Sequence, residues 1–254
     1  MGRIFSFSYG AVSYLVFFAV FLYAIGFIGN FAVPKAMDSA AHGSLTSALL
    51  INTLLLSLFA VQHSVMARPW FKRILTRFIP QHVERSTYVL LSSLALVLLF
   101  WQWRPLGGVV WDIEANTGRA VVHGLYALGW VILLVSTFLL NHFDLFGVRQ
   151  VWLRLRNKPY TPLIFNEPAF YKWVRHPLYV GWLFIFWSAP TMTVTHLFFA
   201  IVTTTYILVA IQWEEKDLVD EHGEKYLNYR RRVPMLIPRA KKTLATVQGA
   251  AAKA

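Results

Sequence analysis

Five long stretches of apolar residues limit what this chain can fold into. They cover residues 9–32, 45–66, 87–103, 121–140 and 178–213. A helix needs about 20 apolar residues to cross a bilayer, and its backbone groups must be hydrogen-bonded within the segment. The last stretch is interrupted at residues 188–193, which favours a hairpin whose first arm is short. We therefore expect an all-α polytopic membrane protein with five or six transmembrane helices, the last region being a helical hairpin.

The composition agrees with a membrane protein. The chain is 57% hydrophobic and only 14% charged, which is too apolar for an ordinary soluble domain. Cysteine is absent, so the sequence excludes disulfides and thiolate metal sites, and no metal site is predicted. The net charge of +12 points to cytoplasmic loops facing anionic lipid. The expected partner is the lipid bilayer, because no nucleic-acid-binding motif accompanies the charge.

The distribution of Lys and Arg predicts the orientation. The first and third loops hold one and two of these residues, whereas residues 67–87, 143–178 and 214–254 hold five, six and nine. The positive-inside rule then places both termini in the cytoplasm, with a bacterial inner membrane as the expected location. The uncharged turn at 189–194 falls on the far side. We expect one domain over residues 1–240 and a flexible tail over 241–254.

Two polar clusters flank the predicted hairpin. Arg175 and His176 begin it, within "YKWVRHPLYVGW", and Glu214 and Glu215 end it. An antiparallel hairpin returns its end beside its beginning, so the clusters should be neighbours. A carboxylate at a helix C-terminus opposes the helix dipole and needs compensation. Each glutamate therefore has three possible roles. It is solvated where the helix leaves the membrane, it pairs with Arg175, or it contacts a cationic ligand.

These clusters resemble the signature of integral-membrane methyltransferases. The pattern R-H-P-x-Y-x-G, then E-E, then G-x-x-Y-x-x-Y and V-P, over residues 171–234, is similar to isoprenylcysteine carboxyl methyltransferase and bacterial phospholipid N-methyltransferases. The resemblance implies an S-adenosylmethionine site at the cytoplasmic face, formed by about residues 141–238. It implies these cofactor-binding residues: Arg175, His176, Tyr179, Gly181, Glu214, Glu215, Tyr229 and Pro234. No G-x-G-x-x-G fingerprint of a soluble Rossmann domain is present.

Three further segments resemble one family more narrowly. They are "VQHSVMARPWFKR" at 61–73, "NHFDLFGVRQVWL" at 141–153 and "PTMTVTHLFFA" at 190–200. They are similar to the methanethiol S-methyltransferase family, which lies close to NnrU-like membrane proteins. The resemblance implies that a small-molecule thiol, methanethiol, is methylated to dimethyl sulfide, with release of S-adenosylhomocysteine.

The residue chemistry suits such a reaction. Carboxylates can hold the ammonium or the ribose hydroxyls of the cofactor, and Arg175 can pair with its carboxylate. The thiolate is the nucleophile, so the thiol must lose a proton. We expect His142 to act as general base with Asp144 orienting it, which requires the preceding helix to end near residue 141 because positions i and i+2 do not face each other. His63 is the alternative base. Positioning without any base is the other mechanism.

Two other functions stay open at this point. One is a membrane methyltransferase with a lipid or prenylcysteine acceptor. The other is a haem or quinone membrane protein, which paired histidines within one leaflet would support. The sequence does not indicate an oligomeric state.

Overall fold

The computed structural model describes residues 2–40 and 43–238, and it confirms the expected all-α membrane architecture. Five helices in the described part are long and apolar enough to cross a bilayer, so this is an integral membrane protein. They are α1 (Arg3–Gly29), α2 (Leu45–Ala67), α4 (Gln81–Gln102), α5 (Asn116–Leu140) and α9 (Val194–His222). The tail predicted over 241–254 lies outside the described residues.

The predicted hairpin is present, with a short first arm. Helix α8 (Pro177–Trp187) has 11 residues and starts with Pro177 in its first turn. At 1.5 Å per residue it covers about 16 Å, roughly half of the hydrocarbon core. An extended segment then leads to α9, whose first turn is capped by Thr193. Over residues 2–40 and 43–238 the chain therefore has five full spans and one partial span.

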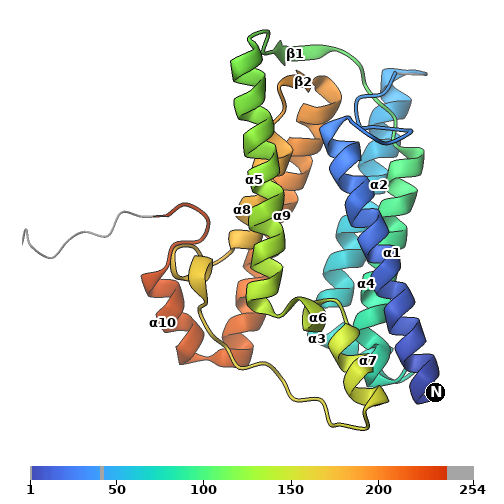
Figure 1. Ribbon diagram of the computed structural model, residues 1–254, viewed down its shortest axis with the longest axis vertical. Helices are drawn as coiled ribbons and strands as arrows, with labels where there is room; N and C mark the ends of the chain where they lie inside the picture. The colour runs from blue at the N-terminus through green and yellow to red at the C-terminus, as the bar shows by residue number, and fades with distance from the viewer. Residues whose placement is uncertain (1, 41–42, 239–254) are drawn as a thin grey trace, which may run out of the picture.

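The long helices form two groups (Figure 1): α4 packs against both α1 and α2, and α8 packs against both α5 and α9. Helices α5 and α8 approach closely because two glycines face each other. A Cβ on Gly181 would lie 2.8 Å from the carbonyl oxygen of Gly129, far inside van der Waals contact. Gly181 was expected to line the cofactor site; in the structure, helix packing accounts for this glycine.

The short helices gather at one end of the molecule (Figure 1), together with the N-terminus of α1. They are α3 (Pro69–Leu75), α6 (His142–Leu145), α7 (Val148–Leu155), η1 (Ala169–Lys172) and α10 (Glu224–Arg232). These helices lie in or at the edge of the three basic regions, residues 67–87, 143–178 and 214–254, which together hold 20 of the 24 Lys and Arg. The described parts of these regions therefore share one end. This is the arrangement that the charge pattern requires.

A small β-ribbon joins the loops at the other end (Figure 1), and the sequence did not predict it. Strand β1 (Val109–Asp112) pairs antiparallel with β2 (Thr191–Thr193), within the turn of the hairpin. The ribbon ties the α4–α5 connection to the α8–α9 connection, and thereby fixes the hairpin against α5.

Candidate active site

The two polar clusters of the hairpin meet, as the sequence predicts. The Arg175 Nε donates to Glu215 Oε1 over 2.7 Å, and both side chains are about nine-tenths buried. His176 Nε2 lies 3.0 Å from the same oxygen. The pairing of Arg175 with a carboxylate across the hairpin is thus confirmed. We call Arg175, His176 and Glu215 the clasp.

The expected reason for this pairing was wrong. Helix α9 does not end at the glutamates but continues to His222, about two turns beyond Glu215. The helix dipole therefore does not act on them. Glu215 needs compensation because it is a buried carboxylate, and buried charges are costly unless they are paired and hydrogen-bonded.

The C-terminal segment holds the clasp from behind. The backbone N–H groups of Arg175 and His176 donate to the carbonyl oxygens of Pro234 and Met235 over 2.9 and 3.2 Å. The Arg175 guanidinium also donates to the Val233 carbonyl oxygen. Arg175 was expected to pair with the cofactor carboxylate, whereas here its side chain links α8, α9 and the segment after α10. Pro234 contributes its backbone to this link.

Two tyrosines of α10 complete the support. The Tyr229 hydroxyl donates to the Tyr171 carbonyl oxygen over 2.7 Å, inside the protein. The Tyr226 side chain is buried, yet its hydroxyl has no hydrogen-bond partner among the described residues. Tyr229 therefore has a supporting role, while Tyr226 offers an unused donor next to Glu215.

Glu214 is the available carboxylate of the pair. Its side chain is 43% exposed, and among the described residues only Tyr179 donates to it, over 2.9 Å. His176 Nδ1 lies 4.0 Å from its Oε2. Because the Glu215 carboxylate is already paired with Arg175 and His176, Glu214 is the carboxylate of the two that can contact a ligand.

Five tyrosines from five different elements lie close enough to Glu214 to interact with it electrostatically. We call them the tyrosine cluster: Tyr88, Tyr171, Tyr179, Tyr206 and Tyr226. In Tyr171 and Tyr226, outside the spans, burial first and the nearby glutamates second raise the pKa of the phenol, so both stay neutral. Tyr179 is the member that hydrogen-bonds Glu214 in the described structure. A carboxylate that has electron-rich rings in its vicinity is suited to an organic cation.

The predicted pair of His142 and Asp144 does not form. Helix α5 does end at Leu140, as that prediction required. The Asp144 carboxylate, however, pairs with Arg149 over 2.8 Å. The two ring nitrogens of His142 are held by Tyr14 and Thr137, each at 2.8 Å. Asp144 points to a cation instead of the imidazole because the tight turn of α6 separates the two side chains.

His142 is also poorly placed to take a proton from a substrate. Its ring is buried and stacks on Phe138, with centroids 4.4 Å apart. Burial lowers the pKa of this imidazole. With both nitrogens occupied, His142 anchors α6 to α1 and α5.

His63 lies nearer to the tyrosine cluster. The Tyr88 hydroxyl lies 2.9 Å from its Nε2, and Ser92 Oγ lies 3.3 Å from its Nδ1. Since Tyr88 belongs to the tyrosine cluster, His63 contacts that cluster through one hydroxyl. His63 and His142 are each hydrogen-bonded by hydroxyl groups and, among the described residues, not paired with a second histidine. Neither therefore has the paired histidines that would support a haem protein.

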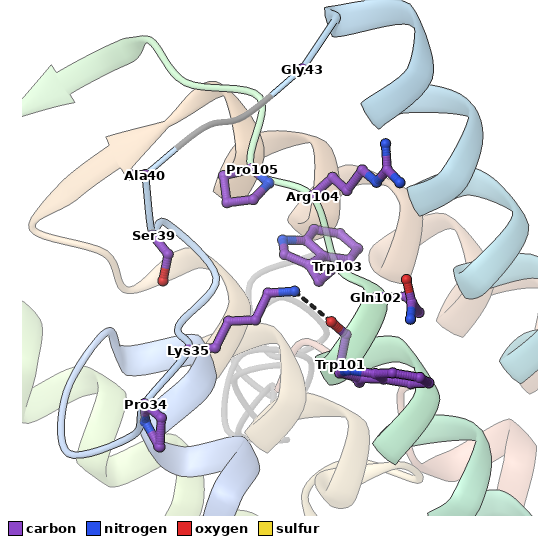
Figure 2. Close-up of a pocket in the computed structure, with 10 residues that line it drawn as sticks. All are labelled: Pro34, Lys35, Ser39, Ala40, Gly43, Trp101, Gln102, Trp103, Arg104 and Pro105. Atoms are coloured by element: carbon purple, nitrogen blue, oxygen red, sulfur yellow. Dashed lines mark hydrogen bonds between the residues drawn. The ribbon is translucent and has the colours of Figure 1, made fainter.

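A hollow of about 650 Å³ lies at the opposite end of the molecule (Figure 2). Lys35 and Arg104 are among its lining residues, and its described lining includes no acid. The Lys35 ammonium donates to the Trp101 carbonyl oxygen over 2.5 Å and so caps the C-terminus of α4. This hollow contains none of the predicted site residues and is unsuited to a cation. In the described part of the chain, no three His, Asp or Glu side chains gather as metal ligands.

Comparison with known proteins gives close relatives. A methanethiol S-methyltransferase of Crocosphaera subtropica is 61% identical, over 94% of this chain and 93% of that protein. A methanethiol S-methyltransferase of Mycobacterium tuberculosis is 52% identical, over 94% of this chain and 98% of that protein. A nurim homologue of Drosophila melanogaster is 28% identical, over 80% of this chain and 88% of that protein. No family model and no solved structure matches.

Proposed function

This chain belongs to the methanethiol S-methyltransferase family, and we propose that it transfers a methyl group from S-adenosylmethionine to methanethiol. The products are dimethyl sulfide and S-adenosylhomocysteine. The observation that supports this most directly is Glu214, a partly exposed carboxylate that is hydrogen-bonded by Tyr179 and lies within electrostatic reach of the other tyrosines of the cluster. S-Adenosylmethionine, when bound, supplies a methyl group on a positively charged sulfur that leaves as a neutral thioether.

The residues of the site fit such a cofactor. Glu214 holds its positively charged groups, and the tyrosine rings surround the charge. The unpartnered Tyr226 hydroxyl is a donor for a polar edge of the cofactor. The clasp holds the N-terminus of α8 and thereby positions Tyr179 and Glu214. Tyr229, Pro234 and Gly181 support this arrangement from behind, within the proposed cofactor-binding part at about 141–238.

An assay of methyl transfer tests the proposed function. Purified protein with S-adenosylmethionine should methylate methanethiol, and turnover with hydrogen sulfide, a prenylcysteine or phosphatidylethanolamine should be much lower. If the protein prefers the prenylcysteine or the phospholipid, it is a methyltransferase with a lipid acceptor, and the proposed thiol substrate is wrong. A haem-type absorption spectrum together with no transfer to any acceptor would refute the methyltransferase function.

We also propose that the site faces the cytoplasm from a bacterial inner membrane, with both termini inside. The basic short helices, α10 among them, lie at one end of the molecule (Figure 1), and the segment after α10 is hydrogen-bonded to Arg175 and His176 of the clasp. The positive-inside rule assigns that end to the cytoplasm.

Cysteine labelling tests this orientation, because the chain has no cysteine of its own. Single cysteines at Ser39 and Thr117 should react with an impermeant reagent added to intact spheroplasts. A cysteine at Thr76 should react only after lysis. The reverse pattern would contradict a cytoplasmic site.

A further inference from the structure

The proposed function leaves open which residue takes the proton of the thiol, and one pair of side chains beside the tyrosine cluster is free for that task. Tyr88 on α4 and His63 on α2 are in hydrogen-bond contact, at 2.9 Å between the hydroxyl and Nε2. Neither takes part in the clasp. Buried polar groups of this kind inside a membrane protein are usually functional.

The imidazole of His63 is held in one orientation. Phe59 stacks on the ring, with centroids 5.1 Å apart. Ser92 Oγ lies 3.3 Å from Nδ1 and accepts a hydrogen bond from the Gln62 amide. The Tyr88 hydroxyl lies 2.9 Å from Nε2 and 3.0 Å from Nδ1, so when Nδ1–H donates to Ser92, the unprotonated Nε2 is within hydrogen-bond distance of that hydroxyl. The ring is therefore arranged to accept a proton from Tyr88.

The surroundings of Tyr88 suit a small thiol that becomes negative. The guanidinium of Arg85 lies 5.1 Å from the centre of the Tyr88 ring, and Arg68 is also within electrostatic reach. These cations favour an anion beside the hydroxyl. Met66 and Val89 pack against the same ring and provide an apolar wall. Tyr206 and Glu214, where the methyl donor is proposed to bind, are within electrostatic reach of Tyr88 as well.

We propose that methanethiol binds against the Tyr88 hydroxyl and loses its proton to the Tyr88–His63 pair. The inference rests on the proposed function. The S–H bond breaks as the proton passes to the Tyr88 oxygen, and the Tyr88 proton passes to His63 Nε2. The sulfur electron pair forms the new bond to the methyl carbon while the carbon–sulfur bond of the methyl donor breaks. The imidazolium later releases its proton to water. Tyr88 is the catalytic residue, and His63 acts through it.

Two variants and two acceptors test this proposal. Tyr88→Phe keeps the ring and removes the hydroxyl, and His63→Gln keeps hydrogen bonding without a basic nitrogen. With methanethiol at pH 7, each should lower kcat by about 10²-fold. With 2,2,2-trifluoroethanethiol, which is more acidic and already largely ionised at pH 9, the loss should fall below about tenfold because no proton has to be removed. The Kd for S-adenosylmethionine should stay within about threefold of wild type, which a collapsed site would not allow.

Tyr9→Phe is the matched control. It also removes a partly buried phenol hydroxyl, one on α1 that hydrogen-bonds Thr87 Oγ1 over 3.0 Å. Thr87 is the sequence neighbour of Tyr88, yet this variant should leave kcat with both acceptors unchanged. Equal losses for the two thiols would mean that Tyr88 and His63 only support the fold, and near-normal kcat in both variants would also overturn the proposal. If wild-type protein methylates neither thiol, the proposed function itself fails, which is a separate outcome.

Discussion

Replacing Glu214 with glutamine is expected to weaken S-adenosylmethionine binding roughly 30-fold, which corresponds to about 2 kcal/mol. The glutamine keeps the shape of the side chain and still accepts the hydrogen bond from Tyr179, so only the charge is lost. Loss of a desolvated charge contact costs about 2–5 kcal/mol. We expect the lower end of that range because solvent reaches the 43% exposed side chain. Titration calorimetry of the purified protein measures the change directly.

A second ligand and a control variant make this result specific. S-Adenosylhomocysteine carries the amino group but lacks the charged sulfur. Equal losses for both ligands would indicate that Glu214 contacts the ammonium, and a loss confined to S-adenosylmethionine would indicate the sulfonium. Glu224→Gln, which changes an exposed acid on α10, should bind both ligands normally. Unchanged affinity of Glu214→Gln for both ligands would remove Glu214 from the cofactor site.

The parts of the fold that the sequence predicted follow from local rules. Run length and the position of Lys and Arg are properties of contiguous segments, so the five spans, the short hairpin arm and the common basic end could be predicted. The contact of Arg175 with a glutamate followed from hairpin geometry alone. The continuation of α9 beyond Glu215 was missed because charged residues were taken as the end of a span, although Glu and Lys have high helix propensity and continue a helix in water.

The tyrosine cluster could not be predicted from one motif. Its members come from five elements, and the recognised signature contains two of them, Tyr179 in R-H-P-x-Y-x-G and Tyr226 in G-x-x-Y-x-x-Y. Tyr88 and Tyr206 were visible as polar-tipped residues inside apolar runs, which is the one signal that pointed to them. The His142–Asp144 prediction went wrong for the same reason. Spacing along the chain gave two plausible partners, while Tyr14, Thr137 and Arg149 supplied nearer ones from the folded structure.

Replacing Arg175 with methionine is expected to lower the midpoint of thermal unfolding by roughly 10 °C, since it leaves the Glu215 carboxylate buried with only His176 and a distant Arg230. Breaking a buried ion pair from one side costs about 3–5 kcal/mol, largely because the remaining charge stays desolvated. The double variant Arg175→Met with Glu215→Leu removes both charges. It should recover most of the lost stability, because an apolar pair of similar volume avoids the desolvation penalty.

The same pair of variants separates two roles for Arg175. If the arginine only holds the clasp, the double variant should recover S-adenosylmethionine affinity along with stability, because Glu214 and Tyr179 return to their positions. If Arg175 pairs with the cofactor carboxylate, as the sequence first suggested, stability should recover while the affinity stays low. If Arg175→Met is as stable as wild type, the clasp does not stabilise the fold, because the 2.7 Å contact with Glu215 would then make no net contribution to the free energy of unfolding. Thermal unfolding and calorimetry on the same preparations decide between these outcomes, and the structure favours the first.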